Sequence, residues 1–419
     1  MNKAKRIICI LLSLCLIIGF ASCKNDNPDE NITENPSSNQ TQNENNDNDI
    51  KVLSLNKESI SHHEWYEDFP TMLVKSEYSD VTLDKSMEEQ YPELAEALSE
   101  TSTMRKRTME DEKDNLLADA TREFMNDGEA FSTHISTLDV YVRRADSVAV
   151  SILEDYNSDG VRAISGLNYD TESGEKLALS DVVNDVPSIS SLVEKEILNR
   201  IGEDESLGGT AVADYFNNRS EDDIRWTLEY NGITFWFNPG DIAPTNFGVQ
   251  TVTLTFEKYP ELFVEKYTAV PSAYTVGLPL STYLYTDVTG DKQTEEIFVE
   301  AFSNDDIAYS SFALQTEESY YEDELVSYGL EPYYVKTVDG NSYIFIFSKN
   351  SDDETSLNVF DLKDGKVKFV DEAGLGILCN QKGIYTLPTN PAELELFDYD
   401  NSSSNTYFVG ENGISQIKK

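Results

Sequence analysis

The sequence predicts an α+β domain followed by an all-β module that is either a sandwich or propeller-like. In the first folded half, segments with helical periodicity come before segments that alternate every second residue. Toward the end of the chain, short apolar or aromatic runs are separated by turns rich in Asp, Gly, Asn and Ser. Residues 1–50 stand apart, because they combine a short apolar leader with a polar stretch that cannot form a core.

The N-terminal residues 1–22 have the pattern of a secretory signal peptide. Basic residues precede an apolar run that begins at Ile7 and ends in Ala21 and Ser22, with Cys23 next. The run is too short to span a bilayer comfortably. Its end resembles a bacterial lipobox, in which the cysteine is acylated, so we expect a lipid on Cys23 to hold the protein at the extracellular face of the cell membrane. The alternatives are an uncleaved membrane anchor and an ordinary signal peptide.

Residues 23–50 contain almost nothing that could be buried, so we expect a disordered tether. Loss of Lys3, Lys5 and Arg6 with the leader changes the formal net charge from −45 to −48. Such acidity disfavours nucleic acid and anionic lipid surfaces as partners and favours basic proteins and divalent metals. It is equally explained as a property that only keeps a surface protein soluble.

The first folded domain, residues 51–268, opens with one strand-like segment and two helical ones. Residues 53–83 have a mixed pattern, and the strand-like segment is its last part, Val81–Leu83. Residues 87–99 favour a helix that Pro92 either starts or interrupts. A second helix is expected over residues 104–126, with Gly128 just after it as a stop signal.

The rest of this domain changes to a period of two and contains one more helix, expected over residues 188–202. Asn157–Gly160 is expected to be a turn between two strands, and Asn231-Gly232 is a strong hairpin signal. The expected strands are residues 138–142, 148–152, 161–169, 226–230, 233–237 and 250–256.

Residues 269–419 form the expected all-β module. Turns such as Val338–Asn341 and Leu362–Gly365 separate its apolar runs. No repeat in it is regular enough to fix a number of propeller blades. The expected strands are residues 298–302, 333–337, 343–347, 357–360, 366–370 and 407–409.

Several stretches of the first domain together resemble one known family. Roughly residues 130–265 are similar to the extracellular domain of RsiV-type anti-sigma-V factors and of related bacterial surface proteins. The resemblance implies an RsiV-like, helical-plus-antiparallel-sheet recognition domain that works outside the cell. The stretches that carry it are Arg144–Ser147, Tyr169-Asp170, Gly174–Leu177, Leu179–Asp181 and, most specifically, Asn231–Pro244.

In the anti-sigma-V factors this domain binds lysozyme and thereby controls the proteolytic release of a sigma factor. That signalling requires a transmembrane helix and a cytoplasmic sigma-binding segment, whereas this chain offers the expected lipid anchor. The resemblance therefore implies recognition of a ligand without signalling across the membrane. Lysozyme is strongly basic, which suits the acidity of this chain.

The loop after the strand at residues 233–237 is the candidate ligand-binding segment. Its prolines and its glycine fix an unusual backbone path, and loops held by a sheet often carry binding sites. The other interpretation, slightly favoured, is a structural corner, and two of the three aromatic residues at 235–237 are expected in the core. The candidate ligand-binding residues are Trp236, Asn238, Pro239, Asp241 and Pro244.

No sequence motif supports an enzyme. The histidines are His62, His63 and His134, and the segment His63–Glu67 lacks the second histidine of a zinc protease. We find no Gly-x-Ser-x-Gly elbow, phosphate loop or Cys-x-x-Cys pair. Carboxylate pairs are too common in so acidic a chain to indicate glycosidase chemistry.

Residues 287–297 contain a candidate calcium loop. Oxygen-bearing side chains stand at every second position around Gly290, as in the first half of an EF-hand loop. The twelfth position is Phe298 instead of glutamate, and the pattern resembles the calcium loops of propeller and integrin-like repeats, which lead directly into a strand. An acidic β-turn without metal explains the same residues. The candidate Ca²⁺ ligands are Asp287, Thr289, Asp291, Gln293 and Glu295.

These observations favour a lipid-anchored bacterial surface protein that binds a basic protein such as lysozyme, or a cell-wall ligand such as peptidoglycan, without catalysis. One alternative is a carbohydrate-active enzyme of the cell envelope. It predicts a concave site with two carboxyl groups about 5–9 Å apart and a raised pKa on one of them. The other alternative is a structural surface protein without a ligand.

Overall fold

The computed structural model describes residues 50–419 apart from several short gaps. The expected signal peptide, Cys23 and residues 24–49 of the expected tether lie outside the described residues. The gaps are residues 67–70, 129–130, 202–209, 304–307, 353, 377–383, 387–392, 399–402, 411–412 and 418–419.

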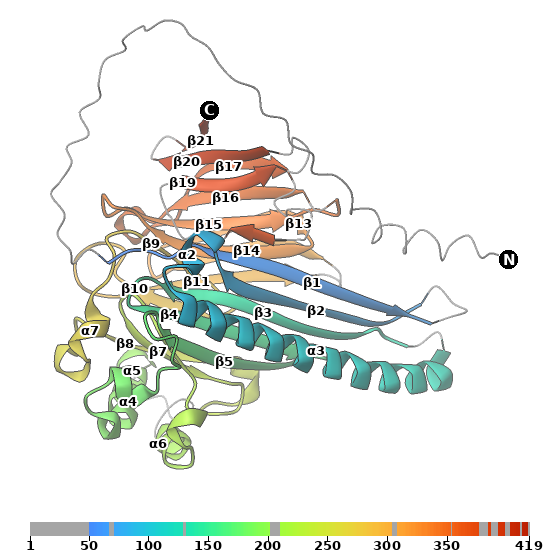
Figure 1. The fold of residues 1–419 in the computed structure, drawn as a ribbon, viewed down its shortest axis with the longest axis horizontal. Helices are drawn as coiled ribbons and strands as arrows, with labels where there is room; N and C mark the ends of the chain where they lie inside the picture. The colour runs from blue at the N-terminus through green and yellow to red at the C-terminus, as the bar shows by residue number, and fades with distance from the viewer. Residues whose placement is uncertain are drawn as a thin grey trace, which may run out of the picture. The chain divides into compact units, whose positions relative to one another are not determined.

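The N-terminal part of the fold is built on a six-stranded sheet (Figure 1). Its strand order is β18-β1-β2-β3-β4-β5; β2 and β3 run parallel, and the other neighbours run antiparallel. The expected turn between β4 and β5 is present, and Asp159 and Gly160 have the positive φ values, 47° and 81°, that a tight hairpin requires. The strands are β1 (Leu55–Trp65), β2 (Met72–Leu83), β3 (His134–Ala145), β4 (Ala149–Ser158), β5 (Val161–Asp170) and β18 (Ile384–Thr386).

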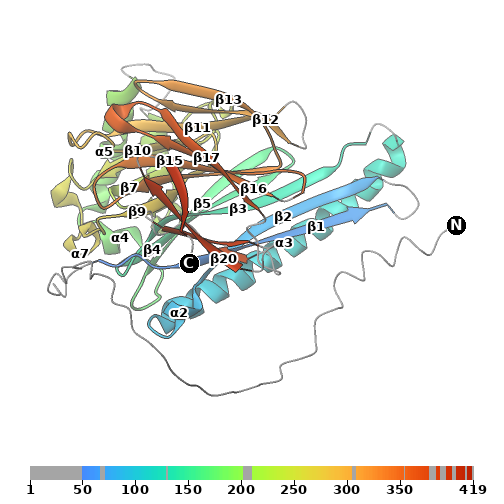
Figure 2. The same cartoon turned by 90° about the horizontal axis from the view of Figure 1, so that it is seen from above.

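Helix α3 (Pro92–Asp127) connects the parallel strands β2 and β3 and lies along one face of this sheet (Figures 1 and 2). The prediction of two helices here is wrong, because the polar residues between them continue one helix. Thr101, for example, donates its hydroxyl to the carbonyl of Ala97 at 3.0 Å. Pro92 starts the helix, where its missing N–H costs nothing, and Gly128 caps its end with a φ of 56°, as predicted.

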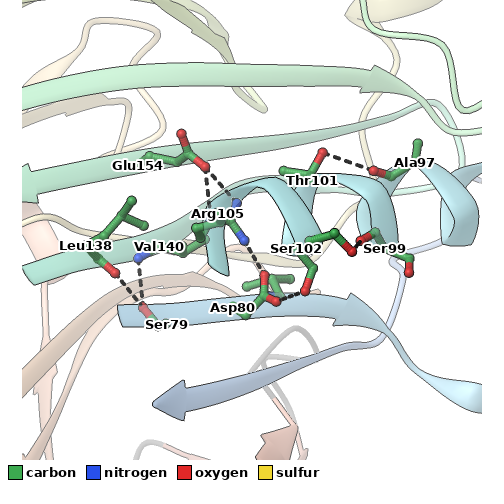
Figure 3. A network of polar contacts seen from close by, with 12 residues as sticks. Ser79, Asp80, Ala97, Ser99, Thr101, Ser102, Arg105, Leu138, Val140 and Glu154 are labelled. Carbon is green, nitrogen blue, oxygen red and sulfur yellow. Dashed lines mark hydrogen bonds and ion pairs between the residues drawn. The ribbon is translucent and has the colours of Figure 1, made fainter. Parts of the chain in front are cut away.

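Arg105 fixes α3 to the sheet by bridging two strands (Figure 3). Its guanidinium donates to Glu154 of β4 at 2.9 and 2.8 Å and also pairs with Asp80 of β2. Ser102, one turn earlier, donates its hydroxyl to the same Asp80 carboxylate. Arg105 is 4% exposed, so solvent screens these ion pairs little. The helix therefore covers one face of the sheet and leaves the opposite face to other elements.

A smaller layer follows β5 and contains most of the other helices. Its sheet, in the order β6-β7-β8, packs Phe235 and Phe237 against Ile197 of α5 and Tyr215 of α6. The strands and α5 were predicted, whereas α6 was not. The elements are α4 (Leu179–Val182), α5 (Ile189–Ile201), α6 (Thr210–Asn217), α7 (Glu265–Thr268), β6 (Trp226–Leu228), β7 (Gly232–Phe237) and β8 (Gln250–Thr255), and the short helix α2 (Lys85–Glu88) precedes α3.

Two larger antiparallel sheets, in the orders β10-β11-β12-β13 and β17-β16-β15-β14-β9, form most of the C-terminal part. Val299 and Leu314 of the first sheet share a core with Ile344 and Phe360 of the second. The broad prediction of an α+β chain with a β-rich end is confirmed. The strands are β9 (Tyr274–Gly277), β10 (Tyr283–Thr286), β11 (Glu295–Ser303), β12 (Tyr309–Thr316), β13 (Tyr320–Ser327), β14 (Gly329–Lys336), β15 (Ser342–Lys349), β16 (Thr355–Asp361) and β17 (Lys368–Gly376), and a third sheet contains β19 (Glu393–Asp398), β20 (Ser403–Gly410) and β21 (Gly413–Ile417).

Residues on both sides of the expected domain boundary at 268/269 contribute to one core. Val140 of β3 belongs to the same hydrophobic cluster as Val335 of β14 and Phe345 of β15. Arg143 of β3 also donates to the backbone carbonyl of Gly277 in β9 at 2.5 Å. The chain from Asn48 onward is accordingly one compact unit. Among its described helices, none combines the length and the apolar character needed to cross a bilayer.

Candidate ligand-binding cavity

A cavity of about 910 Å³ lies between the six-stranded sheet and the ends of strands β14 and β15. Serine and threonine hydroxyls, the rings of Tyr328 and Phe347 and several charged groups line it. Its volume and mixed lining are typical of a site for a small ligand with polar groups. The acidic, basic and histidine side chains in the lining are His63, Lys75, Glu77, Asp139, Glu331 and Lys349.

Strand β1 supplies one wall of the cavity through the alternation of its side chains. Glu64 binds Lys113 of α3 at 3.3 Å, so Ser61 and His63 point to the other face of the sheet, where they line the cavity. On that face, exposure along β1 rises from Lys57, which is buried, to Ser61 and His63, which are exposed. The sheet is therefore covered at its Lys57 end and open to the cavity at its His63 end.

Polar contacts link this part of β1 to β2. In the antiparallel pairing of the two strands, Ser61 lies opposite Glu77 and His63 lies opposite Lys75. The Ser61 hydroxyl donates to Oε1 of Glu77 at 3.1 Å and lies 3.1 Å from Nε2 of His63. Nζ of Lys75 pairs with Oε2 of Glu77 at 2.9 Å. Both carboxylate oxygens of Glu77 therefore have a partner in the cavity wall.

Lys57 and Glu331 form an ion pair at the covered end of the cavity, with Nζ and Oε1 3.2 Å apart. The other carboxylate oxygen of Glu331 accepts a hydrogen bond from the hydroxyl of Tyr333 at 3.1 Å. Since Lys57 belongs to β1 and Glu331 to β14, the pair joins the two sheets that enclose the cavity.

The carboxyl group of Asp139 in β3 also lines the cavity. Within the part of the chain that the structure describes, no hydrogen bond or ion pair reaches this carboxyl group. The directly paired residue on β4 is Asp155, which Arg162 holds at 2.9 and 2.5 Å. Two carboxylates at paired positions of adjacent strands repel each other.

These surroundings raise the pKa of Asp139 to about 6. The largest cause is desolvation by the protein atoms around the carboxyl group, although the side chain is exposed to the cavity. Lys57 lowers the pKa, whereas Asp155, Glu331 and Glu77 raise it further. Asp139 therefore gains or loses its charge just below neutral pH.

Trp236, the first of the predicted ligand-binding residues, is fully buried. Its ring packs with Leu153 and Ile164 of the six-stranded sheet, and its Nε1 donates to the hydroxyl of Thr227 at 2.8 Å. The guanidinium of Arg143 lies 5.3 Å from the ring centroid. The prediction that Trp236 contacts a ligand is corrected, because the six-stranded sheet covers this face of β7.

The loop after Trp236 is held together by its own polar contacts. Asp241 accepts from Arg219 at 2.9 Å and from Arg225 at 2.6 Å, and it also accepts from the backbone N–H of Asn238 at 2.7 Å. The side chain of Asn238 accepts from a backbone N–H of β5 at 2.7 Å. These contacts match a structural corner, and of the predicted ligand-binding residues Asn238, Pro239 and Asp241 are half-buried while Pro244 is exposed.

The loop between β10 and β11 brings together three of the five predicted calcium ligands. One carboxylate oxygen each of Asp287, Asp291 and Glu295 lies within 4.8 Å of the other two. Thr289 donates its hydroxyl to Glu295 at 3.1 Å, and Gln293 donates its backbone N–H to Asp291 at 2.8 Å. Asp287 accepts two further backbone N–H groups of the loop at 2.6 and 3.0 Å. These hydrogen bonds would also stabilise the loop as an acidic turn without a bound metal ion.

The cavity and Asp139 were not predicted from the sequence. The apolar alternation of Leu138, Val140 and Val142 identified β3, but nothing in it indicates what covers Asp139 on the opposite face. The covering strands β14 and β15 lie far away in the sequence. A weak signal is the stretch Ser59–His63, where small hydroxyl residues alternate on a strand without a clear apolar face.

Residues 179–257 match the model of the DUF3298 family, described as a protein of unknown function. The matched segment runs from α4 to just beyond β8 and includes the corner loop but none of the residues that line the cavity. No curated protein matches this chain.

Two crystal structures of DUF3298 family proteins are similar to part of the chain. The one from Bacteroides fragilis is 14% identical, with a TM-score of 0.39, over 52% of this chain and 96% of its own. The one from Pseudomonas aeruginosa PAO1 is 14% identical, with a TM-score of 0.35, over 52% of this chain and 97% of its own.

Proposed function

We propose that this protein is held at the extracellular face of a bacterial membrane by a lipid on Cys23 and binds a cell-wall ligand in the cavity without catalysis. The single observation that carries the proposal is the cavity of about 910 Å³ with its mixed hydroxyl, aromatic and charged lining. The signal-like leader and the polar tether support a place of action outside the cytoplasm.

A peptidoglycan fragment fits this lining in its chemistry. Such a fragment combines the hydroxyl groups of sugars with the charged groups of a short peptide. The cavity offers hydroxyls for the former, and both acidic and basic side chains, such as Glu77 and Lys75, for the latter. Tyr328, which is 49% exposed, adds an aromatic ring on which a sugar can stack.

Calorimetric titration with soluble peptidoglycan fragments tests the proposal. Ser61→Tyr places a bulky ring in the cavity and should weaken binding by more than about tenfold. Ser99→Tyr is the matched control, because Ser99 is exposed on α3, which lies on the opposite face of the sheet. Equal affinities of the Ser61→Tyr variant and the original protein would contradict the proposal, as would a complete lack of binding, which favours a structural surface protein.

A basic protein such as lysozyme is the second candidate ligand, supported by the net charge of −45 and by the resemblance to RsiV-type domains. Binding of this kind should weaken steeply as the salt concentration rises from 0.05 to 0.5 M, because salt screens the attraction between exposed charges. It should survive Ser61→Tyr, since a folded protein does not enter the cavity. Salt-independent binding, or no binding at low salt, argues against lysozyme.

An envelope enzyme acting on carbohydrate is the alternative from a different class, and Asp139 is the observation that favours it. The cavity contains several carboxyl groups, and a pKa of about 6 suits a general acid. Such an enzyme should release new reducing ends from peptidoglycan, and Asp139→Asn should abolish the release. Binding without any release supports the non-catalytic function.

We also propose that the loop at residues 287–295 binds Ca²⁺. The proposal is supported by the convergence of the carboxylates of Asp287, Asp291 and Glu295. This loop is separate from the cavity, because none of its residues lines it. The metal would therefore stabilise the β10–β11 connection and take no part in ligand binding.

A further inference from the structure

The acidic side chains that surround Asp139 all have a cationic partner, whereas Asp139 has none within the described residues. Each ion pair balances its own charge. Asp139 is therefore the one carboxylate of this group whose negative charge the protein leaves uncompensated. The paired acids and their partners are Glu77 with Lys75 at 2.9 Å, Glu331 with Lys57 at 3.2 Å and Asp155 with Arg162 at 2.5 Å.

We propose that Asp139 binds a free ammonium group of a cell-wall glycopeptide that occupies the cavity. This inference rests on the proposed function of the cavity and names the chemistry of its ligand. A primary ammonium group carries the positive charge that Asp139 lacks beside it among the described residues, and it offers three N–H donors to this carboxylate. Charge-assisted hydrogen bonds of this kind are stronger than neutral ones.

A divalent metal ion suits the same position less well. Ca²⁺ takes six to eight oxygen ligands, which one carboxylate cannot supply. Recruiting Glu77 or Glu331 as further ligands would break their ion pairs and leave Lys75 or Lys57 without a partner. A monovalent ammonium group needs only the carboxylate that is already free.

The rest of the lining suits the sugar part of such a ligand. The exposed ring of Tyr328 lies in the cavity wall beside serine and threonine hydroxyls. The ring of Phe347 also lines the cavity. Sugar rings present C–H groups that pack on such aromatic faces while their hydroxyls hydrogen-bond to polar side chains.

The protonation of Asp139 should control this contact. Its pKa of about 6 means that the carboxyl group is charged above pH 6 and neutral well below it. A lysine-type ammonium group keeps its charge throughout this range, since its pKa is about 10.4. Affinity should therefore fall as the pH drops below about 6. The groups that face Asp139 are Lys57 of β1, Glu77 of β2, Tyr141 of β3, Asp155 of β4, Arg162 of β5, Tyr309 of β12 and Glu331 of β14.

The test compares two disaccharide-peptides that differ in one group. The first carries a lysine side chain, and in the second the Nε atom of that lysine is acetylated. Calorimetric titration of the full-length protein in detergent gives Kd for each compound at pH 7.5 and at pH 5. We expect the lysine compound to bind about 10-fold more tightly at pH 7.5, and the preference to shrink to about twofold at pH 5, where most of the Asp139 carboxyl groups are neutral.

Two variants complete the experiment. Asp139→Asn should bind both compounds equally at both pH values. It should also fold normally, as thermal unfolding will verify, because the acid that it removes has no partner among the residues that the structure describes. Asp114→Asn, at an exposed position on α3, should behave as the original protein does.

Equal binding of the two compounds by the original protein would overturn the ammonium contact and leave the cavity as a ligand site. A preference for the lysine compound that survives Asp139→Asn would also overturn it. Failure of both compounds to bind would overturn this inference and the proposed cell-wall ligand together.

Discussion

Single residues with buried charges hold the layers of this protein together. Arg143 pairs with Glu229 at 2.7 Å and Arg144 pairs with Asp146 at 2.8 Å, and all four side chains are almost completely buried. Arg144 also donates to two backbone carbonyls at 2.8 and 2.7 Å. Removing one partner of such a pair is costly, because the remaining charge stays in a poorly solvated environment.

Arg105 allows a direct measurement of this effect. Arg105→Met leaves Asp80 and Glu154 without their cationic partner, so we expect the free energy of unfolding to fall by about 3–5 kcal/mol. Urea denaturation of the purified protein measures the change. Arg107→Met is the matched control, because the Arg107 side chain is 84% exposed, and its effect should stay within about 0.5 kcal/mol. A loss of less than 1 kcal/mol for Arg105→Met would contradict the prediction.

His134 makes one contact of the sheet sensitive to pH. Its Nδ1 lies 2.6 Å from Asp159 and its Nε2 lies 3.0 Å from Glu123, so the imidazolium joins β3, the β4–β5 turn and α3. Burial alone would lower the pKa of His134, but the hydrogen bonds to the two carboxylates outweigh it and raise the pKa. The stabilisation is therefore complete below the unfolded pKa of about 6.5 and is lost as the pH rises through the folded pKa.

Asp159→Asn tests this contact, because asparagine keeps the hydrogen-bonding shape and tolerates the positive φ at this position. We expect NMR titration of the His134 ring to give a pKa above 6.5 in the original protein and a lower one in the variant. Asp114→Asn on the exposed side of α3 should leave the titration unchanged. If His134 titrates identically in the Asp159→Asn variant, the contact between His134 and Asp159 does not raise its pKa and the prediction is wrong.

At the scale of elements, close backbone contact between β5 and β6 joins the six-stranded sheet to the smaller layer. A Cβ atom added at Gly166 would lie 2.0 Å from the backbone oxygen of Trp226. Since that oxygen belongs to the main chain, it cannot move aside as a flexible side chain does. Glycine is needed here for space, and its backbone is not in the left-handed region.

Gly166→Ala should therefore destabilise the protein by about 1–3 kcal/mol or more, the usual cost of overpacking. Gly374→Ala in β17 is the control, because a Cβ atom there meets nothing within 4 Å. The control should be neutral or slightly stabilising. Thermal unfolding of both variants measures the difference, and equal melting temperatures would show that β6 can shift away from β5.

The loop between β10 and β11 should respond to Ca²⁺. With a Kd of about 1 mM, 10 mM Ca²⁺ would stabilise the folded protein by about 1.4 kcal/mol. Differential scanning calorimetry with Ca²⁺, and with Mg²⁺ for comparison, measures the shift. Asp291→Asn keeps an oxygen acceptor for the N–H of Gln293 and should abolish the response. The loop is a metal-free turn if Ca²⁺ does not raise the melting temperature.

At the scale of the whole molecule, the net charge of −45 opposes folding through self-repulsion. Salt screens this repulsion, with a Debye length of about 30 Å at 0.01 M and 10 Å at 0.1 M. We therefore expect the melting temperature to rise between 0.01 and 0.15 M NaCl, with Ca²⁺ removed by a chelator. A melting temperature that falls over this range would mean that favourable ion pairs outweigh the general repulsion.

The sequence predicted the elements whose signals are local. Periodicity and turn residues within each segment predict strands β3 to β8, helix α5 and the end of helix α3 at Gly128. Helix α6 and strand β1 were missed, because α6 is short and β1 alternates between polar residues on both faces. The break expected before Met104 is absent, since Thr101 bonds back to the helix and Arg105 ties it to the sheet.

The sequence by itself determined the α+β class and the acidity of the protein. It also determined which residues form two local loops, at Asn238–Pro244 and at Asp287–Glu295. Each of these depends on neighbours in the chain. Only the tertiary structure decided that Trp236 is core and that Asp139 lines a cavity. Whether a strand residue is covered depends on which distant strand packs over it, and the alternation along one strand contains no information about that partner.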